Sequence, residues 1–81
     1  MEIHYKVADI NFNNNTIFIT IDDIPYNFLL EEVSSKLKDA SEMERQFLKV
    51  SPSGYGIHWP LIDEDLSIES LLHKITIRPR P

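Results

Sequence analysis

The segment TIFITIDDIPYNF, residues 16–28, constrains the fold more strongly than any other part of the chain. Isoleucines alternate with other residues at positions 17, 19 and 21, which is the pattern of a strand that buries one face. Asp22–Asp23 has the composition of a turn, and the apolar alternation resumes at Ile24. Pro25 cannot donate a hydrogen bond to a neighbouring strand. The segment therefore predicts two antiparallel strands, the second of which lies at a sheet edge.

The residues before this pair predict one more strand. The segment IHYKVADINF, residues 3–12, is rich in β-branched and aromatic residues. A run of asparagines at residues 13–15 follows as a turn, because Asn tolerates positive φ. The parity of the apolar residues changes near Val7–Ala8, which predicts either a bulge or a change of buried face at that point.

A spacing typical of helices begins after residue 28. Leu30, Val33 and Leu37 stand at positions i, i+3 and i+7, so that they share one helix face. Glutamates early and lysines late in this stretch complement the helix dipole. The sequence SEME, residues 41–44, has the pattern of a capping box and predicts a second short helix ending at residue 46 or 47.

The C-terminal half returns to strand and turn signals. FLKV (47–50) and YGIHW (55–59) are expected as strands on either side of a Pro-containing turn, and Ser67 is suited to cap a last helix. We expect the order βββ-αα-ββ-α in a single α+β domain spanning residues 1–81, with antiparallel strands packed against short helices. Residues 75–81 are expected to form an extended tail.

Composition restricts the chemistry and the partners of the chain. Its 81 residues include no cysteine, which excludes disulfides, thiolate nucleophiles and sulfur-ligated zinc. Thirteen acidic against eight basic residues give a net charge of −5, which argues against broad binding to phosphate backbones and favours a basic protein partner. No apolar run approaches the roughly 20 residues that span a bilayer, and the N-terminus lacks the pattern of a signal peptide. We therefore expect a cytoplasmic protein that does not enter membranes.

Potential site residues gather between residues 53 and 67. His58, Asp63 and Asp65 offer the imidazole and carboxylate groups of a small metal-dependent or acid–base enzyme. However, Pro60 prevents a continuous helix between the histidine and the carboxylates, and their spacing matches neither HExxH nor a calcium loop. We therefore expect no catalytic, metal or cofactor site, and the enzyme remains an alternative.

Most of this segment is explained by folding. Trp59 is expected in the core, Gly54 in a turn that needs positive φ, and Gly56 where another group approaches the backbone closely. A short surface is left over as the expected contact site for a partner protein, and it consists of Tyr55, His58, Asp63, Glu64 and Asp65.

The same region, written as GYGIHWPLIDEDLSIESLL, resembles the signature of a small bacterial family catalogued as domain of unknown function 2442. The family's Tyr-Gly-Ile-His/Tyr-Trp-Pro core corresponds to residues 55–60, its acidic element to residues 63–67 and its closing leucine pair to Leu71–Leu72. The opening YKVADINF and the strand at residues 17–21 also fit, so the resemblance covers nearly the whole chain. The chain departs from the family at its two early turns, which are often Asp-Gly there, and in its first helix, which usually carries aromatic and proline residues.

The resemblance implies a compact α+β domain without an established enzymatic activity. Some members look like partners of a neighbouring small protein in toxin–antitoxin-like gene pairs, and others carry an added helix-turn-helix that would bind DNA. The sequence stops at Pro81, so we expect the first role, an antitoxin-like protein-interaction module with a basic partner. Alternatives are a DNA-associated transcriptional regulator that uses Arg78 and Arg80, and a homo-oligomer that pairs through the Pro25 edge strand.

Overall fold

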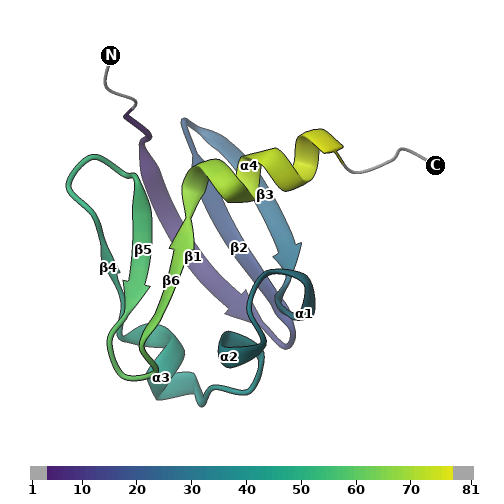
Figure 1. Cartoon of the computed structure of the whole chain (residues 1–81), viewed down its shortest axis with the longest axis vertical. Helices are drawn as coiled ribbons and strands as arrows, with labels where there is room; N and C mark the ends of the chain where they lie inside the picture. The colour runs from purple at the N-terminus through teal and green to yellow at the C-terminus, as the bar shows by residue number, and fades with distance from the viewer. Residues whose placement is uncertain (1–3, 78–81) are drawn as a thin grey trace.

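The computed structural model describes residues 4–77, in which two antiparallel sheets and several short helices surround one core (Figure 1). The elements are, in chain order, β1 (Val7–Asn13), β2 (Thr16–Ile21), β3 (Ile24–Leu29), α1 (Leu30–Val33), α2 (Ser35–Lys38), α3 (Glu42–Gln46), β4 (Lys49–Val50), β5 (Gly56–Trp59), β6 (Glu64–Ser67) and α4 (Ile68–Ile77). The first sheet has the strand order β1-β2-β3 and the second has the order β4-β5-β6. The α+β class predicted from the sequence is confirmed.

Tight turns join the strands of the first sheet. Asn14, Asp22 and Asp23 have φ values of 56°, 52° and 70°, a left-handed conformation that Asn and Asp adopt more readily than most other residues. Between these turns, the isoleucines at 17, 19 and 21 are at most 1% exposed. The strand that contains Pro25 lies at the edge of the sheet, as predicted.

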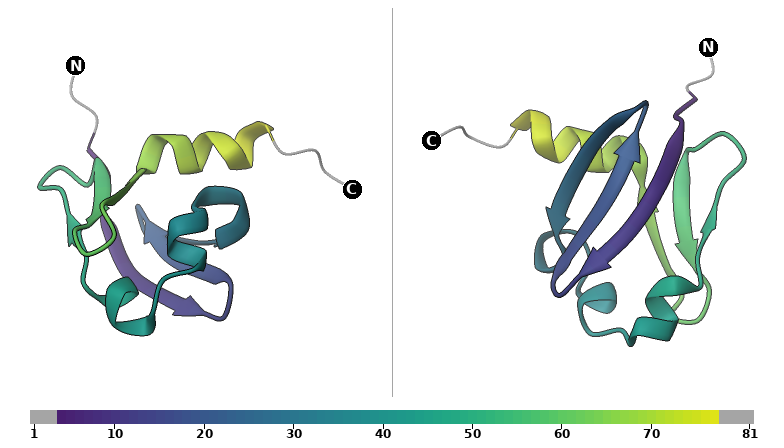
Figure 2. Two further views of the ribbon diagram at one scale, coloured as in Figure 1. Left: turned by 60° about the horizontal axis from the view of Figure 1, so that its bottom comes forward. Right: turned by 180° about the vertical axis from the view of Figure 1, so that it is seen from behind.

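Of the two alternatives predicted for the first strand, the bulge is present. The register of β1 against β2 shifts between Ala8 and Asn11, and Asp9 between them has a φ of 52°. The extra residue falls slightly after Val7–Ala8, where the parity changes. Seen from behind, the strands of this sheet lie in front of α4 (Figure 2), so this helix is on the far face of the sheet in that view.

The first helix differs from the sequence-based expectation, because it is broken at Ser34. This residue has extended backbone angles, φ −166° and ψ 106°, and separates α1 from α2. Its buried hydroxyl accepts a hydrogen bond from the backbone N–H of Leu37 at 3.1 Å and donates one to Glu64. A serine side chain that bonds locally competes with the helical hydrogen bonds, and here it ends one helical turn and caps the next. The capping box of α3, from Ser41 to Glu44, is formed as predicted.

The second sheet contains a strand that was not predicted. The sequence indicated no strand at residues 63–65, yet β6 pairs with β5 in a register that joins Trp59 to Glu64 and Gly56 to Ser67. Glu and Asp are poor strand formers by themselves. The pairing with β5 and the burial of Leu66 override this local preference.

The last helix begins as predicted and ends later than expected. Ser67 Oγ accepts a hydrogen bond from the backbone N–H of Ser70 at 3.2 Å, which is the bond of an N-cap. α4 then continues to Ile77, into the segment that was expected to be an extended tail; residues 78–81 lie outside the described part. None of the helices within residues 4–77 is long and apolar enough to cross a bilayer.

Trp59 occupies the core and connects the two sheets. Its fully buried ring packs edge-on against Phe12, with 6.4 Å between the ring centroids. The indole Nε1 donates a hydrogen bond to the backbone oxygen of Arg45 at 2.9 Å. The Arg45 guanidinium in turn donates to the backbone oxygens of Asn14, Leu37 and Lys38. These bonds tie α3 to both sheets and fix the position of β5.

Candidate functional site

The two faces of the second sheet have different roles. On β5, Ile57 and Trp59 point into the core and are at most 1% exposed. Side chains alternate along a strand, so Gly56 and His58 lie on the opposite, outer face. The register places Ser67 beside the glycine and Asp65 beside the histidine on that face.

A row of polar side chains crosses the three strands of the outer face. His58 Nδ1 lies 2.8 Å from Asp65 Oδ1, and on the other side of the histidine the register pairs it with Lys49 of β4. The side chains of His58 and Asp65 are 42% and 75% exposed. Water screens an ion pair this exposed, so its contribution to stability is small. The pair fixes the orientation of the imidazole more than it stabilises the fold.

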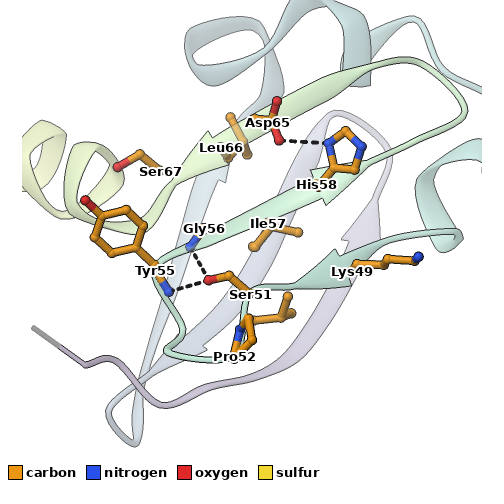
Figure 3. Close-up of a pocket in the computed structure, with 11 residues that line it drawn as sticks. Lys49, Ser51, Pro52, Tyr55, Gly56, Ile57, His58, Asp65, Leu66 and Ser67 are labelled. Carbon is orange, nitrogen blue, oxygen red and sulfur yellow. Dashed lines mark hydrogen bonds and ion pairs between the residues drawn. The ribbon is translucent and has the colours of Figure 1, made fainter.

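An open groove with a volume of about 490 Å³ lies next to this row (Figure 3). Tyr55 and Ser67 stand at one end of it and the His58–Asp65 pair at the other, while Gly56 lies between them. Pro52 and neighbouring residues of β4 complete the wall. The groove is therefore built from all three strands of the second sheet and from the loop between β4 and β5.

This loop is held in place by Ser51. Its Oγ accepts hydrogen bonds from the backbone N–H groups of Tyr55 at 2.8 Å and Gly56 at 3.1 Å. Gly54 within the loop has a φ of 70°, and a Cβ atom there would lie 1.8 Å from the backbone oxygen of Tyr5. Only glycine fits this position, as the sequence predicted. The loop is thus anchored at both ends, yet it leaves the Tyr55 side chain 63% exposed.

Comparison with protein families identifies the chain. A family described as "Protein of unknown function (DUF2442)" matches residues 7–76. The chain belongs to the DUF2442 family. The comparison confirms the family that the sequence signature indicated. No curated protein and no solved structure matches the chain, so the function of this DUF2442 domain has to be inferred from its own geometry.

The structure brings together only part of the expected contact surface. Tyr55, His58 and Asp65 all line the groove. Glu64 belongs to the inner face of β6, where it is half-buried and accepts the hydrogen bond from Ser34. Asp63 forms the turn before β6 with a φ of 52°, and its backbone oxygen accepts a hydrogen bond from Lys36 Nζ at 3.1 Å. Neither of these two acidic residues lines the groove.

Sequence reasoning did not name the other residues of the groove as contact residues, Lys49, Pro52 and Ser67 among them. The sequence had assigned these three only to a strand, a turn and a helix cap. Their shared position depends on the registers of β4, β5 and β6. The one available signal was Gly56, because a glycine on the same strand face as His58 leaves room beside it.

Of the side chains expected for the metal-dependent alternative, the structure pairs His58 with Asp65. Within residues 4–77, no three or more His, Asp and Glu side chains lie close enough together to hold one metal ion. His58 and Asp65 form a pair, and the turn conformation of Asp63 places it outside the groove. What this DUF2442 domain presents on its outer face is an open groove with an aromatic side chain at one end and a polar pair at the other.

Proposed function

We propose that this DUF2442 domain is a cytoplasmic protein-interaction module that binds a more basic protein through the outer face of its second sheet. The observation that carries the proposal is the groove beside Tyr55. Tyrosine is enriched among the residues that dominate binding energy at protein interfaces. Here the ring is 63% exposed although its backbone is anchored by Ser51, so a partner would meet a side chain held on a fixed support.

Charge supports a basic partner. The chain carries a net charge of −5, and the exposed side chain of Asp65 lines the groove. Complementary charges of this kind accelerate association and select between partners more than they add affinity. We expect the rate of association to fall with increasing salt, because exposed charges are screened.

The finer proposal is an antitoxin-like role, in which the partner is the small protein encoded by the neighbouring gene. It rests on the family resemblance, since some members look like partners of a neighbouring small protein in toxin–antitoxin-like gene pairs. The test is co-expression of the two proteins, followed by affinity purification of the tagged DUF2442 domain and by growth measurements. We expect a stoichiometric complex and, for an antitoxin, restored growth of cells that express the partner.

A matched pair of variants links the complex to the groove. Tyr55→Ser should weaken the complex by about 30-fold, as expected for an interface tyrosine that carries about 2 kcal/mol. Phe18→Ser changes an aromatic residue on the first sheet, which is also exposed, and should leave the complex intact. No complex and no rescue of growth would contradict the antitoxin role, whereas an equal effect of both variants would contradict the assigned surface.

The His58–Asp65 pair supports a second candidate, a small acid–base or metal-dependent enzyme. A carboxylate 2.8 Å from Nδ1 orients an imidazole, as bases in active sites require. Calorimetric titration with Zn²⁺ and with Mn²⁺ tests the metal-dependent form, and no heat at millimolar metal would remove it. The DNA-associated alternative depends on Arg78 and Arg80, which lie outside the described residues.

A further inference from the structure

The floor of the groove lacks a covering side chain. Gly56 and Ser67 face each other across β5 and β6, and both line the groove. Glycine offers no side chain to the sheet surface, and a serine is too small to cover a neighbouring glycine. A Cβ atom on Gly56 would lie 3.0 Å from the backbone oxygen of Leu66, so a side chain at this position would press on the backbone of β6.

An aromatic ring is the group that fits such a floor. Within sheets, a glycine is stabilised when an aromatic side chain from a neighbouring strand packs flat over it. The ring of Tyr55 stands at the end of the groove, and His58 stands at the other end (Figure 3). The volume of about 490 Å³ falls within the range of about 300–1,000 Å³ that is usual for ligand sites, which leaves room for a ring between the two.

The charges around the groove are distributed unevenly. Asp65 of β6 contacts His58 through Oδ1, and its other carboxylate oxygen has no partner among residues 4–77. Lys49 lies on the opposite strand, β4. A cation of a bound partner is therefore favoured on the β6 side of the groove.

Addition of a partner strand to the sheet is a poorer fit. The edge strands of this sheet are β4 and β6, and β4 has only two residues, Lys49 and Val50. Pro52 follows directly after Ser51 and cannot donate a hydrogen bond. A lysine and a nearby proline are features that protect sheet edges against pairing. The partner is thus expected to insert side chains into the groove instead of extending the sheet.

We propose that the groove binds a tryptophan or other aromatic side chain of a protein partner, stacked on Gly56 between Tyr55 and His58, with a neighbouring arginine or lysine of the partner on Asp65. This inference rests on the proposed protein-interaction function and specifies the partner's chemistry. It assigns Gly56 the role of a specificity-determining position, because any side chain there would occupy the place of the partner's ring.

The test uses the whole chain and blocked pentapeptides, so it does not require a known partner. The ¹⁵N-labelled protein is titrated with Gly-Arg-Trp-Arg-Gly up to about 5 mM, a concentration suited to a weak contact with a dissociation constant near 1 mM. We expect shifts of the amide signals of residues 55–58 and Ser67. Replacing the peptide tryptophan by alanine should abolish the shifts. Replacing both arginines by glutamate should weaken binding about 2- to 5-fold for each exposed charge pair that is lost.

Two protein variants test the floor of the groove. Ser67→Thr keeps the hydroxyl that caps α4 and adds a methyl group beside Gly56, and it should weaken binding of the tryptophan peptide several-fold. Ser41→Thr makes the same change at the N-cap of α3, away from the groove-lining residues, and should leave binding unchanged. Asp65→Asn should remove the preference for the arginine peptide over the glutamate peptide.

The outcomes separate this inference from the proposed function. The inference is overturned if the tryptophan peptide causes no shifts, if the alanine peptide binds equally well, or if the two threonine variants behave alike. If the peptides fail while Tyr55→Ser still disrupts a complex with a protein partner, the protein-interaction function stands and the aromatic chemistry is wrong. If the peptides bind as expected and no protein partner is found by co-expression, the groove chemistry stands and the choice of the neighbouring gene product is wrong.

Discussion

The two sheets have the same number of strands but differ in strand length and in the surfaces that they present. Each has three antiparallel strands, but the strands of the first have 6 or 7 residues and those of the second have 2 or 4. Turns of two residues link the long strands, whereas residues 51–55 and 60–63 link the short ones. In the second sheet the connecting loops therefore supply a large share of the surface, and a groove lies between a loop and the strands.

The difference shows how a small fold separates stability from binding. Long strands with tight turns place successive side chains in regular cross-strand pairs, and the three isoleucines of β2 are almost fully buried. Because the strands of the second sheet are short, loop residues such as Tyr55 form part of the surface around its outer face. Binding residues are commonly found on loops that a rigid scaffold positions, and here the scaffold is the bond network around Ser51 and Trp59.

The largest expected effect on stability distinguishes the buried face of β5 from its exposed face. Trp59→Ala removes the ring that connects both sheets and should lower the free energy of unfolding by about 3–5 kcal/mol, enough to unfold much of a domain of this size. His58→Ala, one residue earlier on the exposed face, should change it by less than about 1 kcal/mol. Urea denaturation followed by circular dichroism measures both values. If the two variants lost similar free energies of unfolding, the assignment of Trp59 to the buried face and His58 to the exposed face would be contradicted.

The next effect tests the loop of the second sheet. Gly54→Ala places a Cβ atom against the backbone oxygen of Tyr5 and forces alanine into positive φ, so we expect destabilisation of about 3 kcal/mol. The control Ser53→Ala changes the neighbouring residue of the same loop and should have little effect. A tolerated alanine at position 54 would show that the loop is not held against the first strand as described.

A smaller effect tests how the second sheet is joined to the helices. Ser34→Ala removes both the cap of α2 and the partner of the half-buried Glu64, and it should cost about 1–2 kcal/mol. Ser35→Ala removes an adjacent, exposed hydroxyl and should be nearly neutral. Thermal unfolding of the two variants compares them, and equal melting temperatures would refute the role of Ser34.

The smallest expected change in stability belongs to the groove. Tyr55→Ser alters a side chain that is 63% exposed, and it should change the free energy of unfolding by no more than about 0.5 kcal/mol. The same substitution should disrupt binding, as described above. A strongly destabilised Tyr55→Ser variant would mean that this ring supports the fold, and the contrast between the two sheets would then be lost.

Most of the architecture could be predicted because its signals are local. The alternation at residues 17–21, the asparagine and aspartate turns, and the capping box at Ser41 each reflect a conformational preference of a few neighbouring residues. The break at Ser34 and the strand β6 could not be predicted in this way. Ser34 bonds to Glu64, 30 residues away, and the charged residues of β6 become a strand only because β5 offers them a pairing edge.

The sequence by itself determined the class of the fold, the buried position of Trp59 and the glycine at the tight loop, because periodicity and φ preferences are properties of short segments. It also placed Tyr55, His58 and Asp65 among the candidate contact residues. Only the tertiary structure decided that these three border one groove and that Glu64 turns inward. The physical reason is register: a strand pairing sets which side chains share a face, and this pairing joins segments that the linear sequence does not connect.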